Sequence, residues 1–239
     1  MNFLDNLRKS WSDGNFILLY DSDDREGEVD MVIPSIMVEE RHIALMRNDA
    51  GGLICTALSD ELCENVGLPY MTDIYEKLKD ENLLKMLGHG LPYGARSSFS
   101  IAINHKDSFT GITDVDRAMT INELGNIAEI FKDNENVQDL FTSKFRIPGH
   151  VPLLRGRIGL LKNRKGHTEL GLALCEMTDF GPSVTMCEMM DSDSGQALSV
   201  SDAKKYAEKY NIPFVSGEEI IKFWNNFINN KEVCKKICR

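Results

Sequence analysis

The chain has 239 residues, of which 42% are hydrophobic, and it carries a formal net charge of -10. This length can bury one large core, and the sequence contains neither a linker rich in Pro, Gly and Ser nor an internal repeat, so we predict a single domain over residues 1–239. Because the negative charge repels nucleic-acid phosphates, we expect no nucleic-acid partner. The apolar runs are far shorter than the ~20 residues of a membrane span, and the N-terminus lacks the apolar stretch of a signal peptide. We therefore expect no membrane partner and a cytoplasmic location.

The first half of the chain alternates short apolar runs with helical signals. The predicted strands cover Phe16–Tyr20, Met31–Ile33 and Leu53–Leu58. The predicted helices run from Ser35 to Asp49 and from Ser59 to about Gly67. An acidic stretch, residues 21–30, separates the first two strands, and this pattern predicts a strand, an acidic turn and a second strand.

The second half of the chain continues this mixture of strands and helices. The predicted strands cover Phe99–Ile103, Phe145–Leu154 with a break at Pro148-Gly149, Arg157–Leu161 and Val184–Glu188. Predicted helices run from Thr120 through Phe131, from Thr168 to Met177, from Ser201 to Tyr210 and onward from Ser216, the first and last opened by capping boxes. Several strands are near neighbours in sequence, which favours a mixed sheet with helices on its faces over a purely parallel sheet.

The acidic stretch is the first candidate site. Glu26, Glu28 and Asp30 alternate, so in an extended backbone their side chains point to one side. Carboxylates repel one another, and a turn of this kind between two apolar strands indicates a bound cation or a cationic substrate. Oxygen ligands suit Mg²⁺. The alternative interpretation is a solvated loop that only raises solubility.

Two glycine-bearing turns present a histidine each, His150 after Pro148-Gly149 and His167 after Gly166. An imidazole can bind a metal or move a proton near neutral pH. The segment Arg164–Thr168 also has the parts of a phosphate site: a guanidinium fork, a glycine that permits close backbone approach, and a hydroxyl near a helix N-terminus. The alternative is that both histidines are ordinary surface residues.

Three further features keep two interpretations each. The segment Thr110–Arg117 could line a sugar-phosphate site or form a locally capped turn. Glu188 ends an apolar strand among methionines, where we expect a desolvated carboxylate with a raised pKa, unless its side chain points to solvent. The cysteines indicate reduced, mostly buried thiols, and a zinc site at Cys234 and Cys238 is the weaker alternative because a second ligand pair is missing.

Six motifs in chain order carry a resemblance to a known family. They are Arg25–Asp30 (Arg-Glu-Gly-Glu-Val-Asp), Gly52–Cys55, Thr110–Arg117, Pro148–His150, Gly166–Glu169 and Cys187-Glu188. Their order and approximate spacing resemble the 3,4-dihydroxy-2-butanone-4-phosphate synthase family over nearly the whole chain. Ile147 and the segment 134–143 depart from the family pattern.

The resemblance implies a fold, a cofactor and a set of roles. The fold is an α+β three-layer sandwich, in which helices flank a mixed, twisted β-sheet. Glu26 and His167 would bind Mg²⁺, for which Mn²⁺ could substitute, and His150 and Glu188 would be catalytic. The substrate-binding residues would be Arg25, Glu26, Asp30, Arg164, Lys165, Gly166, His167, Thr168 and Glu188. The family is homodimeric, with sites near the subunit interface.

The implied activity is that of a lyase of riboflavin biosynthesis. D-Ribulose 5-phosphate would give L-3,4-dihydroxy-2-butanone 4-phosphate and formate through a metal-stabilised enediolate, dehydration, skeletal rearrangement and loss of C4. Two other hypotheses remain open at this point. A nucleotide- or RNA-binding module requires a basic concave face, which the charge of -10 opposes. A different sugar-phosphate isomerase or aldolase would give no formate.

Overall fold

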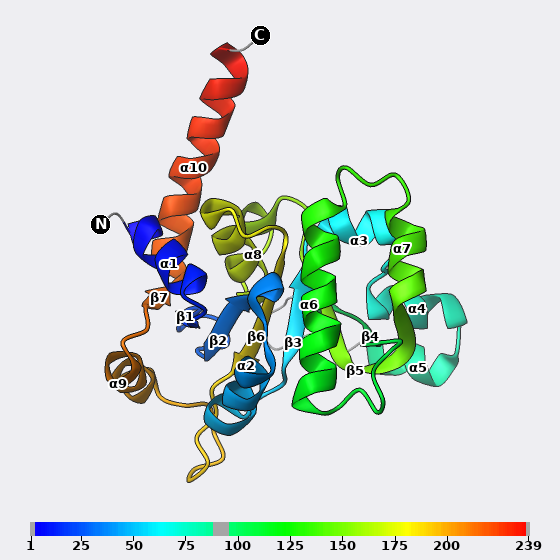
Figure 1. The fold of residues 1–239 in the computed structure, drawn as a ribbon, viewed down its shortest axis with the longest axis horizontal. Helices are drawn as coiled ribbons and strands as arrows, with labels where there is room; N and C mark the ends of the chain where they lie inside the picture. Colours follow the sequence, from blue (N-terminus) through cyan, green and yellow to red (C-terminus); the bar gives the residue numbers. More distant parts are fainter. Residues whose placement is uncertain (1–2, 88–95, 238–239) are drawn as a thin grey trace.

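The computed structural model describes residues 3–87 and 96–237. Its strands are β1 Ile17–Tyr20, β2 Val29–Pro34, β3 Cys55–Leu58, β4 Phe99–His105, β5 Phe145–Arg155, β6 Ser183–Glu188 and β7 Phe214–Ser216. They form one sheet in the order β4-β5-β3-β6-β2-β1-β7 (Figure 1). The pairs β1·β7 and β3·β5 are parallel and the other four pairs are antiparallel, so the prediction of a mixed sheet is confirmed.

Ten α-helices accompany this sheet among the described residues. They are α1 Phe3–Ser12, α2 Glu40–Leu45, α3 Asp60–Val66, α4 Met71–Leu78, α5 Glu81–Leu87, α6 Asp114–Ile130, α7 Val137–Lys144, α8 His167–Thr178, α9 Val200–Tyr210 and α10 Gly217–Ile237. The last of them extends away from the body of the molecule (Figure 1). No helix among the residues described is long and apolar enough to cross a membrane.

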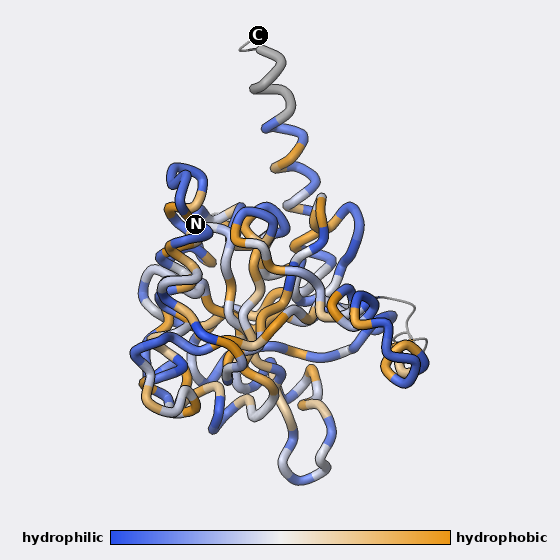
Figure 2. Tube along the Cα trace, turned by 90° about the vertical axis from the view of Figure 1, so that its right-hand side faces the viewer, coloured by the Kyte–Doolittle hydropathy of each residue, from blue (hydrophilic) through white to orange (hydrophobic). Residues whose placement is uncertain are grey.

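The helices cover both faces of the sheet. Because successive strand residues point to opposite sides, each strand contributes to a core on each face. On β1, Leu18 packs into the core beneath α2, α3, α6, α7 and α9, whereas Ile17 and Leu19 pack into the core beneath α1, α8 and α10. Figure 2 shows the resulting hydrophobic centre between more hydrophilic outer segments. The prediction of a three-layer sandwich is therefore confirmed.

Several predicted boundaries are wrong, and local contacts explain why. The helix expected from Thr120 begins at Asp114, because the Thr113 hydroxyl accepts the N–H of Asp116 and caps it, while Thr120 lies inside the helix. The strand expected to break at Pro148-Gly149 is continuous in β5. Residues 157–161 form a loop leading into a 3-10 turn instead of a strand.

The helical predictions were partly correct and partly wrong. The helix expected from Ser35 to Asp49 divides into a 3-10 turn, α2 and a π-helical turn. Helices α1, α4, α5 and α7 were not predicted from the sequence. The capping box at Ser216 is confirmed, because its hydroxyl accepts the N–H of Glu219 and its own N–H donates to that carboxylate.

Four cysteines are buried and reduced, as expected: Cys55, Cys63, Cys175 and Cys187. The side chain of Cys234 and all of Cys238 lie outside the part of the chain that the structure describes.

Candidate active site

The acidic stretch is an ordered turn, and a buried aspartate organises it. The Asp21 carboxylate accepts the backbone N–H groups of Glu26 and Gly27 at 3.0 Å and that of Glu28 at 3.3 Å. Gly27 has a φ of +68°, a left-handed conformation that glycine adopts without a steric penalty. The predicted alternation holds only from Val29, where β2 begins. Glu26 is instead directed by the turn, and the sequence did not identify Asp21 as its support.

The turn meets the start of α8, and this contact brings Glu26 and His167 together. His167 Nδ1 lies 3.1 Å from Glu26 Oε2, and Nε2 lies 3.1 Å from the carbonyl of Glu28. Asp30 Oδ1 lies 3.8 Å from the same Nε2. One imidazole is thus surrounded by oxygen atoms from the turn and from β2.

Burial and the charges of this cluster shift the pKa values of His167, Asp30 and Glu28. Burial opposes protonation of His167, but Asp30, Glu26 and Asp21 outweigh burial and raise its pKa to about 10. Without a metal the ring is an imidazolium whose two N–H groups donate to Glu26 and to the Glu28 carbonyl. Burial raises the pKa of Asp30 to about 7, although His167 opposes that shift, and burial with the charge of Glu26 also raises the pKa of Glu28.

The sheet places a second pair of acids at the same position. Asp30 on β2 and Glu188 on β6 are direct cross-strand partners. Glu188 Oε2 accepts the N–H of Leu53 at 2.7 Å, so its carboxylate is held and does not extend freely into solvent. A Cβ on Gly52 would lie 2.5 Å from that carboxylate oxygen, so this position requires glycine.

Two arginines lie beside the acids. A Cβ on Gly166 would lie 2.5 Å from Arg164 Nη1 and 2.9 Å from Arg25 Nη2, so the two guanidinium groups are neighbours above this glycine. Arg25 lies 3.7 Å from Asp21, and Arg164 lies 2.6 Å from Glu169. The close backbone approach that the sequence indicated at Gly166 is thus an approach to two cationic side chains.

A cavity of about 150 Å³ joins these groups. The predicted residues that line it are Glu26, Asp30, Arg164, His167, Thr168 and Glu188. Sequence analysis did not predict Ser97, Ser98 and Phe99 at its wall, and it left open the role of Cys55, which also lines it. Lys165 is exposed and lines a neighbouring hollow together with Arg25.

The donor set fits a divalent cation. Asp21, Glu26 and His167 offer ligand atoms within 4.8 Å of one another. Asp21 already accepts three backbone N–H groups, so Glu26 and His167 are the better candidates. In addition, Asp30 Oδ1 is buried without a hydrogen-bond partner in the described structure, which a cation or a substrate hydroxyl would satisfy.

His150 is not part of this cluster. It lies on β5, where its exposed ring is held through Nδ1 by the amide of Asn104 at 3.1 Å. Asn104 also accepts the backbone N–H of His150 and donates to the carbonyl of Thr110. A Cβ on Gly149 would overlap the backbone of Ile103, which explains the glycine before this histidine.

The segment Thr110–Arg117 forms the locally capped turn that was one of its two interpretations. The Asp116 carboxylate accepts the N–H groups of Phe109, Thr110 and Gly111. Around this turn lies a group of exposed apolar side chains, which we call the apolar patch. It consists of Phe109 (92% exposed), Ile112 (50%), Val115 (53%), Met119 (37%) and Ile147 (65%).

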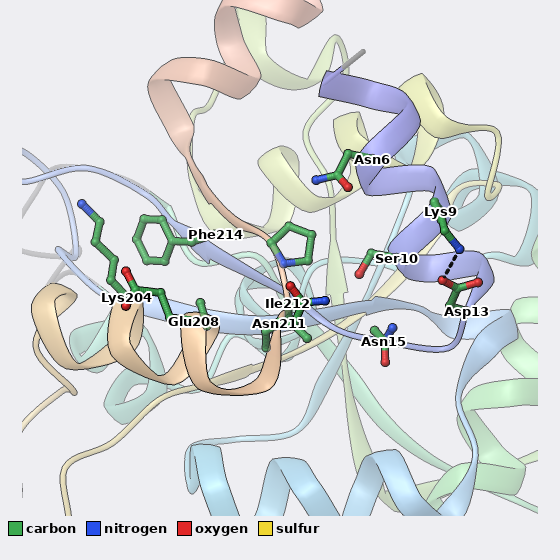
Figure 3. A pocket seen from close by; sticks show the side chains of 12 residues that line it. Asn6, Lys9, Ser10, Asp13, Asn15, Lys204, Glu208, Asn211, Ile212 and Phe214 are labelled. Carbon is green, nitrogen blue, oxygen red and sulfur yellow. Dashed lines mark hydrogen bonds and ion pairs between the residues drawn. The ribbon is translucent and has the colours of Figure 1, made fainter. Parts of the chain in front are cut away.

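A larger hollow elsewhere does not share these features. It is a groove of about 520 Å³ between α1, α9 and the segment before β7 (Figure 3). Its charged groups include Lys9 and Asp13, which pair with each other at 2.6 Å. None of the predicted site residues is among those that line it, so we assign it no role.

Comparison with known protein families gives one consistent result. Residues 5–223 match the sequence model of the family described as 3,4-dihydroxy-2-butanone 4-phosphate synthase. A protein of that name from Methanothermobacter thermautotrophicus is 44% identical over 216 residues, which cover 90% of this chain and 92% of the relative. Another from Archaeoglobus fulgidus is 42% identical over 231 residues, 95% of each chain.

The fold is also similar to solved structures. One is a 3,4-dihydroxy-2-butanone 4-phosphate synthase in complex with two magnesium ions, with a TM-score of 0.75 and 23% sequence identity over 93% of this chain and 96% of that one. At this identity the likeness establishes the fold alone.

Proposed function

We propose that this chain, which belongs to the 3,4-dihydroxy-2-butanone 4-phosphate synthase family, forms that product and formate from D-ribulose 5-phosphate in riboflavin biosynthesis. It is an enzyme, a metal-dependent lyase that cleaves a carbon–carbon bond. The observation that carries the proposal is the meeting of Glu26, Asp30 and His167 with Arg164 at one cavity. The acids and the histidine would contact the sugar oxygens and accept protons, and the arginine would bind the phosphate.

The reaction balances without an oxidant or a reductant. The substrate C₅H₁₁O₈P equals the product C₄H₉O₆P plus formic acid, CH₂O₂. A carboxylate of the cavity wall, Glu188 or an acid of the turn, takes the proton from C3 to give the enediolate. Loss of the C1 hydroxyl as water, a skeletal shift, uptake of one water and expulsion of C4 as formate follow, so the water lost and the water gained cancel. Negative charge develops on oxygen at each stage, so cationic groups at the cavity lower the barrier.

Glu26 and His167 would hold the divalent metal, Mg²⁺ or alternatively Mn²⁺. When bound, it acts as a Lewis acid for adjacent substrate oxygens. Arg25, Asp30 and the segment Arg164–Thr168 would contact the substrate. Lys165 lies on the same loop as Arg164, but its side chain lines the neighbouring hollow. We include it in this set because of its place on the loop.

His150 requires a second subunit in this proposal. Its ring is exposed, it is absent from the lining of the Glu26 cavity, and Asn104 links it to the turn that carries the apolar patch. Exposed apolar groups of this kind are typical of protein–protein contacts. In a two-fold dimer, the patch of one subunit would be covered and His150 would complete the cavity of the other. The single domain over residues 1–239 and the cytoplasmic location are part of the same proposal.

One assay tests the activity. The protein is incubated with D-ribulose 5-phosphate and Mg²⁺, and formate is measured. We expect stoichiometric formate, its loss with EDTA and its recovery with excess Mg²⁺. The absence of formate from the folded protein with Mg²⁺ would reject the proposed function, and an aldose phosphate product would point to an isomerase instead.

A further inference from the structure

Glu169 is a fully buried carboxylate to which the proposed reaction gives no role. It is the third residue of α8 and is 0% exposed. Its Oε2 lies 2.6 Å from Arg164 Nη1, and its Oε1 accepts the backbone N–H of Arg157 at 3.0 Å. A buried carboxylate is unfavourable unless it is paired and hydrogen-bonded, and here both oxygens are occupied. The side chain thus joins α8, the loop that carries Arg164 and the segment that follows β5.

The position of Arg164 needs such support. Its guanidinium is a neighbour of that of Arg25, since both lie within 3 Å of the same point above Gly166. Like charges at this separation repel each other. Each arginine forms an ion pair with an acid, Arg25 with Asp21 and Arg164 with Glu169. The sequence motif Gly-His-Thr-Glu therefore supplies a metal-site histidine, a hydroxyl and the partner of an arginine.

We infer that Glu169 is a positioning residue, which fixes the guanidinium of Arg164 so that its other N–H groups receive the phosphate of the substrate. Arg164 lines the cavity, whereas Glu169 is not among the lining residues, so it acts through Arg164. The ligand class is a phosphate monoester. This inference rests on the proposed function, because that function supplies the phosphate.

The substitution E169Q tests the inference with little change in shape. Only one of the two terminal atoms of an amide can accept, so the side chain can no longer bind the Arg157 N–H through one atom and Arg164 through the other, and the guanidinium loses the negative charge that holds it. We expect KM for ribulose 5-phosphate to rise roughly 10- to 100-fold, the range for a hydrogen bond to a charged group, with a much smaller change in kcat. The inhibition constant of inorganic phosphate should rise by the same factor. E169D keeps the charge but has a shorter side chain. Its KM and its inhibition constant for phosphate should lie between those of the wild type and those of E169Q.

A matched control separates positioning from loosening of α8. Thr178→Val removes a buried hydroxyl from the same helix, where it bonds the carbonyl of Leu174 at 2.6 Å. This variant should lower Tm while KM stays at the wild-type value. A rise of KM in T178V as large as that in E169Q would overturn the inference.

The background variant R164K completes the test. If Glu169 acts through Arg164, E169Q adds no further loss of phosphate affinity in R164K. Fully additive losses, or a folded E169Q and E169D with unchanged KM and phosphate inhibition, would overturn the inference. Phosphate binding by calorimetry keeps this test separate from the proposed function: a wild type that releases no formate rejects the reaction, whereas phosphate affinity still reports on Glu169.

Discussion

The two regions that hold the predicted catalytic residues differ in how complete they are. Around His167, one chain provides Glu26, Asp30 and Glu188 at one cavity, with a pair of arginines beside them. Around His150, one chain provides an exposed imidazole held by Asn104 beside the apolar patch. The first region is a cavity lined by polar groups of one chain. The second is an exposed surface of the kind that is typical of protein–protein contacts.

Burial and charge therefore separate the predicted site into two parts: a cluster formed within one chain and an exposed residue at the surface. The Glu26–His167 cluster depends only on the fold of one chain, because β2, β6 and α8 bring its members together. In the proposed function, His150 takes part in the reaction only when a second subunit covers it. The predictions that follow test this division, beginning with the largest expected effect.

Glu26→Gln and His167→Ala should each abolish formate release while the protein stays folded. In the proposed function either change removes a metal ligand, and loss of Lewis-acid stabilisation worth several kcal/mol lowers kcat by about a thousandfold or more. Steady-state formate assays with saturating Mg²⁺ measure the effect, and circular dichroism checks the fold. Near-normal turnover in either variant would reject the metal assignment.

Co-expression of two inactive variants should restore activity. In a mixed dimer of H167A and H150A, one site combines both defects and the other combines two intact halves. Random pairing makes half of the dimers mixed, so we expect about a quarter of wild-type activity. If the mixture stays inactive although mixed dimers form, His150 acts on its own subunit or not at all, and the contrast between the two regions is wrong.

Phe109→Asp should weaken the proposed dimer. Phe109 is 92% exposed, and burying such a side chain contributes about 1.5–3 kcal/mol, once for each subunit of a two-fold interface. We therefore expect the dissociation constant to rise about 100-fold or more, measured by sedimentation velocity, with activity falling on dilution. Ile158→Asp is the control, because Ile158 is 71% exposed but lines a different hollow, beside Trp224. Equal dissociation in both variants would show that the patch is not specific.

The sequence predicted the chemical types of the site better than their geometry. Glu26 and His167 are 141 residues apart, and only the resemblance of their motifs indicated that they meet. The role of Asp21 was hidden because an acid that binds three backbone N–H groups looks, in sequence, like its solvated neighbours. Ser97 and Ser98 reach the cavity through sheet pairing, which no local pattern encodes.

The errors in the fold have a similar cause. Thr120 was predicted to begin α6, but its hydroxyl accepts the N–H of His105 in the interior, and Thr113, seven residues earlier, caps this helix instead. Pro148-Gly149 predicted a break in β5, yet Gly149 packs directly on the backbone of Ile103, so the strand continues. Local propensity gave way to tertiary contact in both places.

The smallest effect we predict is a proton released when the metal binds. Without metal the pKa of His167 is raised to about 10, so the ring is protonated at pH 7–9, whereas a metal ligand must be neutral. Binding of Mg²⁺ should therefore release about one proton, and the apparent Mg²⁺ affinity should rise up to about tenfold for each pH unit below that pKa and level off above it. Calorimetry in buffers of different ionisation enthalpy counts the proton.

The histidine variants decide which region releases that proton. H150A should keep the proton release of the wild type, because its ring lies in the other region and meets Asn104. His167→Gln should remove the release together with most of the Mg²⁺ affinity. A binding heat that does not depend on the buffer in the wild-type protein would mean that His167 is neutral before the metal arrives. The acids of the turn and of β2 would then surround a neutral ring, and their charge would act on the metal alone.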